Sequence, residues 1–221
     1  MVRLNLLFVV AAAITTLHHC HAAKFKVRVR NLTWLQPFSP PLVVAHTNNI
    51  NLFVEGDDAG DALRYVAENG NNSRFVALRD EDDVVPYLCG ALIADGMVMG
   101  GDTWRGTMEV DLDICEDGIK LSMVAMLVNT NDAFVGFDSI NIFPSGMSKI
   151  YPPAFDAGTE ENNELCAYIP GPACEDVPGN LAAGNGEGYV HIHRGMHGIG
   201  NLSASGYDWR NPVAEVTLFP M

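Results

Sequence analysis

Hydrophobic and polar residues alternate strictly over residues 24–30. Phe25, Val27 and Val29 fall on one face of an extended chain, and lysine or arginine occupies every position of the other face. Residues 108–114 alternate in the same way, but acidic side chains occupy the polar face. Alternation with a period of two predicts strands that are buried on one side only. We therefore expect two half-buried strands whose outer faces carry opposite charge.

Residues 121–128 are apolar on both faces, and this run is too short for a buried helix, so it predicts a central strand. Residues 61–68 show the one helical pattern, and Gly70 follows it as a helix terminator. Further strands are expected near residues 50–54, 139–143, 189–193 and 213–219. Short strands separated by Gly, Pro and Asn clusters indicate an all-β fold. The prediction is an antiparallel β-sandwich with one short helix and long loops.

The first 23 residues have the pattern of a secretory signal peptide. Arg3 precedes nine apolar residues at positions 6–14, and a polar stretch ending in small residues follows. No apolar run reaches the roughly 20 residues that a membrane-spanning helix needs. We expect a secreted chain with a single domain over residues 24–221. Three triplets match the N-glycosylation pattern, which matters in a eukaryotic host; they begin at Asn31, Asn71 and Asn201.

Cysteine usage agrees with secretion. Cys20 lies in the predicted signal peptide, and Cys89, Cys115, Cys166 and Cys174 remain as an even set. Two disulfides are expected outside the cell, and the sequence permits three pairings. The short Pro-Gly loop between the last two cysteines favours Cys166 with Cys174, which leaves Cys89 with Cys115.

The chain is acidic, with 27 acidic and 13 basic residues among 221 and a formal net charge of -14. This balance excludes a basic surface for nucleic acid, while 48% hydrophobic residues are too many for a disordered acidic tail. The sequence has no G-x-S-x-G nucleophile motif, and a disulfide accounts for every mature cysteine. We therefore expect a protein that is not an enzyme.

Two loops collect carboxylates beside rigid elements. Asp132 follows the central strand directly, and Asp156 and Glu160 lie four residues apart in the second loop. Calcium takes 6 to 8 oxygen ligands, and Asn131 and Thr159 would add oxygens to these three carboxylates. On composition alone, a solvated acidic loop is the commoner explanation.

Three segments, at residues 126–136, 155–160 and 208–214, together resemble the spondin N-terminal domain family in motif, order and spacing. The resemblance implies a β-sandwich related to calcium- and lipid-binding sandwich domains, with a calcium ion in loops at one end. Transferred position by position, the family's ligands fall on Asp132, Asp156 and Glu160. The third is Asp in the animal spondins, so Glu160 keeps the charge and lengthens the side chain by one methylene.

A second candidate metal site is the histidine cluster His191, His193 and His197. Alternation places His191 and His193 on one strand face, and a turn at Gly195 would return His197 towards them. Three imidazoles suit zinc or copper. The alternative is that they form hydrogen bonds within loops. The cluster lies outside the animal spondin calcium motif and looks like the pattern in short, stand-alone members of the family.

These observations lead to three hypotheses. The first is a secreted, non-catalytic, calcium-binding β-sandwich that acts as an extracellular binding or adhesion module for an unidentified protein or glycan. The second is a secreted zinc or copper metalloprotein, catalytic or not, that uses the histidine cluster. The third is a structural matrix component whose acidic surface binds cations loosely.

Overall fold

The alternating segment near the N-terminus forms strand β1 (Ala22–Asn31). Phe25, Val27 and Val29 are almost completely buried on one face, while the basic side chains between them are exposed or half-buried. The half-buried strand predicted for residues 24–30 is confirmed.

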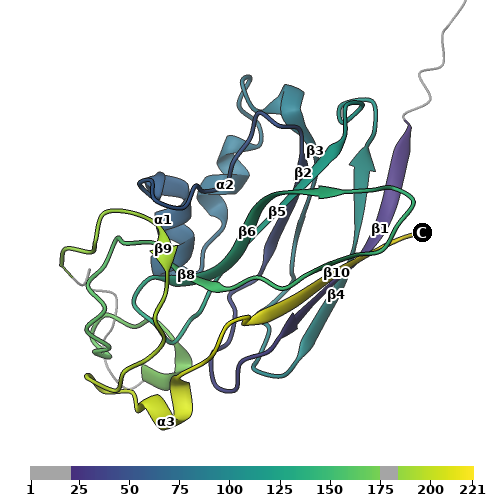
Figure 1. Ribbon diagram of the computed structural model, residues 1–221. Helices are drawn as coiled ribbons and strands as arrows, with labels where there is room; N and C mark the ends of the chain where they lie inside the picture. The colour runs from purple at the N-terminus through teal and green to yellow at the C-terminus, as the bar shows by residue number, and fades with distance from the viewer. Residues whose placement is uncertain (1–20, 175–183) are drawn as a thin grey trace, which may run out of the picture.

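Two antiparallel sheets make up the fold of residues 21–174 and 184–221, which the computed structural model describes (Figure 1). The smaller sheet has the order β4-β1-β10-β7, where the other strands are β4 (Thr103–Asp111), β7 (Ser148–Ile150) and β10 (Ala214–Pro220). The larger sheet has the order β3-β2-β5-β6-β8-β9, with the bounds β2 (Leu42–His46), β3 (Leu88–Ile93), β5 (Ile119–Met126), β6 (Ala133–Ile142), β8 (Ala154–Asp156) and β9 (His191–Ile192). Neighbouring strands in both sheets of the described residues pair antiparallel. The predicted all-β sandwich is therefore confirmed.

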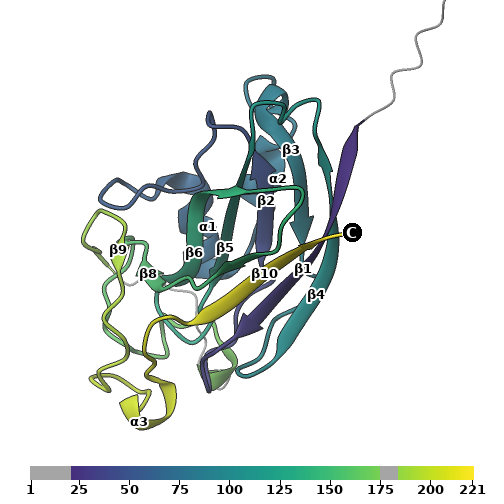
Figure 2. The same cartoon turned by 45° about the vertical axis from the view of Figure 1, so that its right-hand side comes forward.

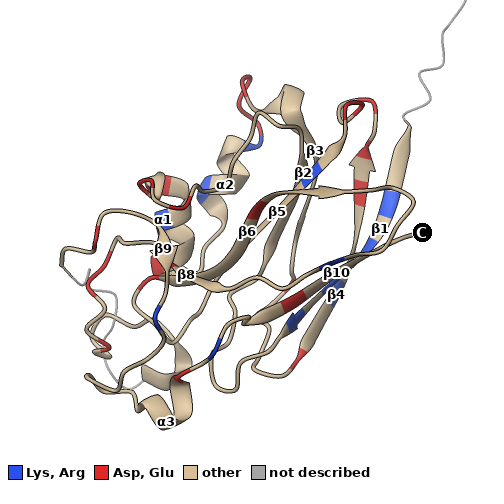
Figure 3. Ribbon diagram, viewed as in Figure 1, with Lys and Arg blue, Asp and Glu red and all other residues tan. Residues whose placement is uncertain are grey.

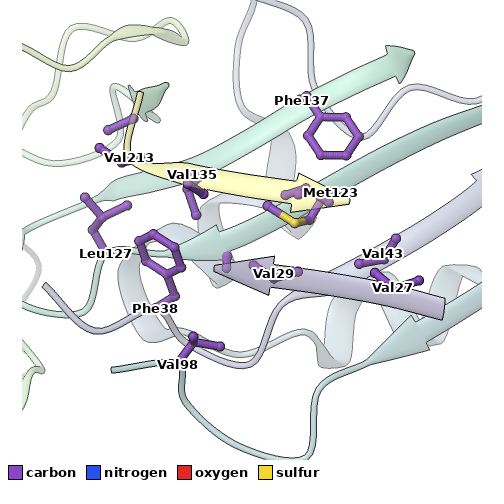
Figure 4. Packing of buried hydrophobic residues seen from close by; sticks show 14 of the residues in the cluster. Val27, Val29, Phe38, Val43, Val98, Met123, Leu127, Val135, Phe137 and Val213 are labelled. Carbon is purple, nitrogen blue, oxygen red and sulfur yellow. The ribbon is translucent and has the colours of Figure 1, made fainter. Parts of the chain in front are cut away.

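The two sheets pack face to face over a common hydrophobic core (Figure 4). Val27 and Val29 from the smaller sheet meet Val43 and Met123 from the larger one, and Phe38 fills the space near one end. Burying a side chain of this kind contributes about 1.5–3 kcal/mol. This core fixes the strand ends from which the candidate site is built.

The outer face of the larger sheet is also covered (Figures 1 and 2). Helix α1 (Gly60–Asn69) packs Leu63 and Val66 against Val124 and Phe134, and Gly70 ends the helix in the left-handed conformation. Strand β5 is buried on both faces for this reason, as its doubly apolar sequence predicts.

Helices are more numerous than expected. In addition to α1, the described residues contain α2 (Ser73–Leu78), α3 (Ala204–Tyr207) and two 3₁₀ turns at Val85–Tyr87 and Pro172–Cys174. The prediction of one short helix was wrong, because the additional segments are too short to show helical periodicity.

The strands predicted at residues 108–114 and 50–54 differ from the structure. The strand expected at residues 108–114 ends at Asp111, whose carboxylate accepts hydrogen bonds from the backbone amides of Asp113 and Ile114 and turns the chain. Residues 50–54 form no strand at all. Leu52 donates its backbone N–H to the Asp138 carboxylate instead, at 2.7 Å. Carboxylates thus replace strand partners in both places.

Both predicted disulfides are present: Cys89 with Cys115 and Cys166 with Cys174. The predicted signal peptide, residues 1–23, falls outside the described residues except for its last three positions, where Ala22 and Ala23 begin β1. In the part of the chain that the structure describes, no helix is long and apolar enough to cross a membrane.

Asn31 is fully buried at the end of β1. Its side-chain amide donates to the carbonyls of Gln36 and Val98, at 2.7 and 2.9 Å. Its side-chain oxygen accepts from the backbone amide and the hydroxyl of Thr33, at 2.9 and 2.7 Å. All the polar atoms of this side chain therefore have partners, and they fix the turn after β1.

Candidate metal centre

Asp132 and Asp156 lie at the same end of two neighbouring strands. Asp132 immediately precedes β6, and Asp156 is the last residue of β8, so the register pairs Asp156 with Ala133. Each of these strands pairs with a neighbouring strand on both edges, β6 with β5 and β8, and β8 with β6 and β9. This pairing fixes the positions of the two residues. The structure therefore brings together the two loops that the sequence singles out.

The carboxylate of Asp132 organises the second loop. Its Oδ2 accepts hydrogen bonds from the backbone amide of Thr159 (2.7 Å), the Thr159 hydroxyl (3.1 Å) and the backbone amide of Glu160 (3.0 Å). Its Oδ1 is buried and has no hydrogen-bond partner among the described residues. A buried acceptor of this kind costs about 1–3 kcal/mol unless something satisfies it.

Asp156 is engaged at both oxygens. Its Oδ1 accepts from the backbone amide of Gly158 at 2.7 Å, and its Oδ2 accepts from the side-chain amide of Asn162 at 2.6 Å. The Nε2 atoms of His191 and His193 each lie 3.9 Å from the same Oδ2. Asp156 therefore links the carboxylate loops to the histidine strand.

The site concentrates negative charge away from water. Asp132, Asp156 and Glu160 are 0%, 1% and 4% exposed. Burial, together with the nearby charge of Asp156, raises the pKa of Asp132 to about 8. Burial likewise raises the pKa of Asp156. No lysine or arginine in the described ranges forms an ion pair with Asp132 or Asp156.

Strand β9 is shorter than the predicted strand at residues 189–193, but it pairs His191 with Asp156. His193 is buried, and its Nδ1 accepts a hydrogen bond from the backbone amide of Gly195 at 2.9 Å. The ring proton is therefore on Nε2, which donates to Asn162 Oδ1 at 3.1 Å. Burial lowers the pKa of His193 to about 4, so this imidazole is neutral at physiological pH.

His191 and His197 have different environments. His191 is half-buried, and its Nδ1 lies 3.2 Å from the carbonyl of Tyr189, to which it donates. The backbone amide of His197 donates to Oε1 of the buried Glu164 at 2.5 Å. That carboxylate also accepts from the backbone amide of Ile199, so it is fully used in holding the loop.

A cavity of about 250 Å³ lies beside Asp156, and all three predicted histidines contribute to its lining. Within the described residues, the three side chains whose donor atoms lie within 4.8 Å of one another are Asp156, Glu187 and His191. This set shares Asp156 with the predicted calcium ligands and His191 with the predicted histidine cluster. Glu187 was missed, because an exposed acid in a glycine-rich stretch gives no sequence signal of its own.

A protein-family model described as Spondin_N matches residues 19–163, which include Asp132, Asp156 and Glu160. The chain belongs to the spondin N-terminal domain family. The spondin family is extracellular, and the two disulfides fit a secreted spondin domain. The match ends before Glu187 and the histidine strand. No curated protein matches the chain.

Proposed function

We propose that this spondin domain is a secreted calcium-binding module that binds an extracellular protein or glycan and carries out no catalysis. Asp132, Asp156 and Glu160 would hold the ion. The observation that carries the proposal is the buried Oδ1 of Asp132, which lacks a hydrogen-bond partner among the described residues beside a second buried carboxylate. A hard cation bound at this oxygen would satisfy it and compensate the charge.

The donor set fits calcium. Calcium prefers carboxylate, carbonyl and amide oxygens, and bonds them at 2.3–2.6 Å. Three carboxylates from two loops offer up to six such oxygens, two of which already accept backbone hydrogen bonds. Those bonds hold the Asp132 and Asp156 carboxylates in place, which reduces the ordering required when an ion binds.

Burial also separates this proposal from the hypothesis of a loosely binding acidic matrix protein. Loose, salt-sensitive binding needs solvent-exposed carboxylates, whereas these three are at most 4% exposed. Figure 3 places basic residues along β1 and acidic residues in the loops around β8 and β9 at the other end of the molecule. A calcium ion at that end would order the loops that a partner contacts.

Thermal unfolding with calcium, magnesium or chelator tests the proposal. Calcium at a hundredfold excess over its dissociation constant should stabilise the parent by about 2.7 kcal/mol. Asp132→Asn should lose this shift while remaining folded, because the amide removes a buried charge and keeps the shape.

Glu161→Gln is the matched control, because it removes the same charge from an exposed position next to Glu160. This variant should keep the full calcium shift. The proposal fails if calcium leaves the parent unchanged, or if Glu161→Gln and Asp132→Asn reduce the shift equally.

A further inference from the structure

We propose a second metal site next to the proposed calcium site, formed by Asp156, Glu187 and His191 and suited to a divalent transition-metal ion such as Zn²⁺. Only Asp156 belongs to both sites. Variants of the unshared ligands, Glu187 and His191 for this site and Asp132 for the calcium site, therefore test the two separately.

The distances suit an ion of this size. One donor atom from each of the three side chains lies within 4.8 Å of the other two, and His191 Nε2 is 3.9 Å from Asp156 Oδ2. Ligands bonded to tetrahedral zinc at about 2.0–2.2 Å lie about 3.4 Å apart. A small inward movement would complete the site. Glu187 is exposed and His191 half-buried, so both have room to make it.

The hydrogen bonding of His191 prepares its ring for a metal. Because Nδ1 donates to the Tyr189 carbonyl, the lone pair of the neutral ring is on Nε2, the atom nearest Asp156. A divalent ion between this nitrogen and the Asp156 carboxylate would bond to both. Histidine ligands typically donate their second ring nitrogen to a carbonyl or carboxylate, which orients the ring and fixes the tautomer.

Backbone contacts place Glu187 at the site even though it lies far from Asp156 in the sequence. The backbone amide of Gly188 donates to the carbonyl of Gly158 at 2.8 Å. On the other side of Glu187, a Cβ at Gly186 would lie 2.3 Å from that same carbonyl oxygen, so only glycine permits the close approach. The chain on both sides of Glu187 is thus held against the loop that follows Asp156.

The chemistry of the donors selects the ion. Calcium binds oxygen ligands, whereas an imidazole nitrogen with carboxylates suits zinc and neighbouring transition metals. Three protein ligands leave a coordination position, and Asp156, Glu187 and His191 all line the cavity of about 250 Å³. A water molecule or a donor group from a partner would occupy that position.

This site differs from the three-histidine cluster that the sequence suggests. Both ring nitrogens of His193 are already committed, to Gly195 and to Asn162. His197 lines the same cavity but is not among the three side chains that meet within 4.8 Å. The two arrangements share His191 alone, and His197 therefore distinguishes them.

Isothermal titration of the full chain with Zn²⁺, in buffer saturated with calcium, tests the proposal. The parent should bind one zinc ion in a saturable manner. Outer-shell substitutions at metal sites typically weaken binding by about 10–100-fold. His191→Ala removes one direct ligand and Glu187→Gln removes the negative charge of another, so each should weaken zinc binding at least about tenfold.

His197→Ala is the matched control, because it removes an imidazole from the same cavity without removing a proposed ligand. It should leave zinc affinity unchanged. Asp132→Asn should abolish calcium binding and preserve zinc binding, which separates the failure of one site from the failure of the other. Unfolding temperatures in chelator should confirm that each variant is folded.

Three results would overturn the site. The first is the lack of saturable zinc binding by the parent. The second is a loss on His197→Ala that equals the loss on His191→Ala, which would favour the three-histidine arrangement. The third is unchanged zinc affinity in the folded Glu187→Gln variant.

Discussion

The backbone of Gly158 packs directly against the backbone of Tyr189. Gly158 has a φ of +68°, and a Cβ at this position would lie 2.4 Å from the Tyr189 carbonyl oxygen and 2.7 Å from its nitrogen. This contact holds the loop after Asp156 against the chain that leads into β9. The position of His191 beside Asp156 therefore depends on a residue that has no side chain.

Gly158→Ala should destabilise the protein and weaken the binding of both ions. A left-handed alanine costs about 1–2 kcal/mol, and relieving the clash must move the Tyr189 backbone as well. We expect a total loss above about 2 kcal/mol in denaturant unfolding.

Gly60→Ala provides the control, because Gly60 has a φ of +66° with no atom within 4 Å of an added Cβ. That variant should show the conformational cost alone, about 1–2 kcal/mol, and should bind metals normally. Equal losses of stability in the two variants would contradict the importance of the Gly158–Tyr189 contact.

The stability of the calcium-free protein should fall as pH rises from 6.5 to 8. The pKa of Asp132 is raised from 3.8 to about 8, so the folded chain retains a proton that the unfolded chain releases. Stability from such a group is lost as pH rises through the folded pKa. The lowered pKa of His193 acts in the opposite sense, but only between about 4 and 6.5. The free energy of unfolding should therefore drop by about 1–2 kcal/mol over the upper window.

Saturating calcium should reverse this pH dependence, because the ion binds the ionised carboxylate and its affinity rises with pH. Asp132→Asn should flatten the pH dependence without calcium. Urea unfolding at a series of pH values measures both effects. An equally steep fall in Asp132→Asn would assign the titration to another group.

The sequence predicts the strands whose surroundings are simple. β1 faces the core on one side and solvent on the other, so hydrophobic and polar residues alternate along it. β5 is covered on both sides, so its sequence is a nearly continuous apolar run. Residues 50–54 have a similar apolar composition but form a loop. Phe53 packs edge-on against Phe134 and Phe155 there, at 5.0 and 5.1 Å between ring centroids. Those partners are distant in sequence, so no local pattern reveals them.

The candidate site also combines residues that the sequence predicts with one that only the fold brings into place. Asp132, Asp156 and Glu160 belong to motifs that resemble a known family, and the structure buries each of the three side chains. Glu187 has no such motif. It reaches Asp156 because the glycines on both sides of it approach the Gly158 carbonyl, and this approach is a property of the fold.

The two disulfides should contribute unequally to stability. Cys89 and Cys115 are 26 residues apart, whereas Cys166 and Cys174 are 8 apart. Constraint of the unfolded chain predicts about 3.5 kcal/mol for the longer loop and about 2.5 kcal/mol for the shorter one.

Paired alanine substitutions at each disulfide, followed by denaturant unfolding, would measure this difference. Loss of the Cys166–Cys174 bridge should cost about 1 kcal/mol less than loss of the other. The reverse order would indicate that native packing around the shorter loop, and not chain constraint, dominates its contribution.

The burial of the Asn31 side chain affects whether this residue can carry an N-linked glycan in the folded protein. A glycan replaces a hydrogen of the side-chain amide, and in the folded chain this amide faces the carbonyls of Gln36 and Val98 without access to solvent. Asn71 and Asn201 are exposed. In a host that glycosylates secreted proteins, an oligosaccharide added to Asn31 during translocation would prevent the turn after β1 from closing. Correctly folded molecules would then carry sugar at Asn71 and Asn201 only. The mass of the secreted product would show whether the turn after β1 had formed before an oligosaccharide could be added to Asn31.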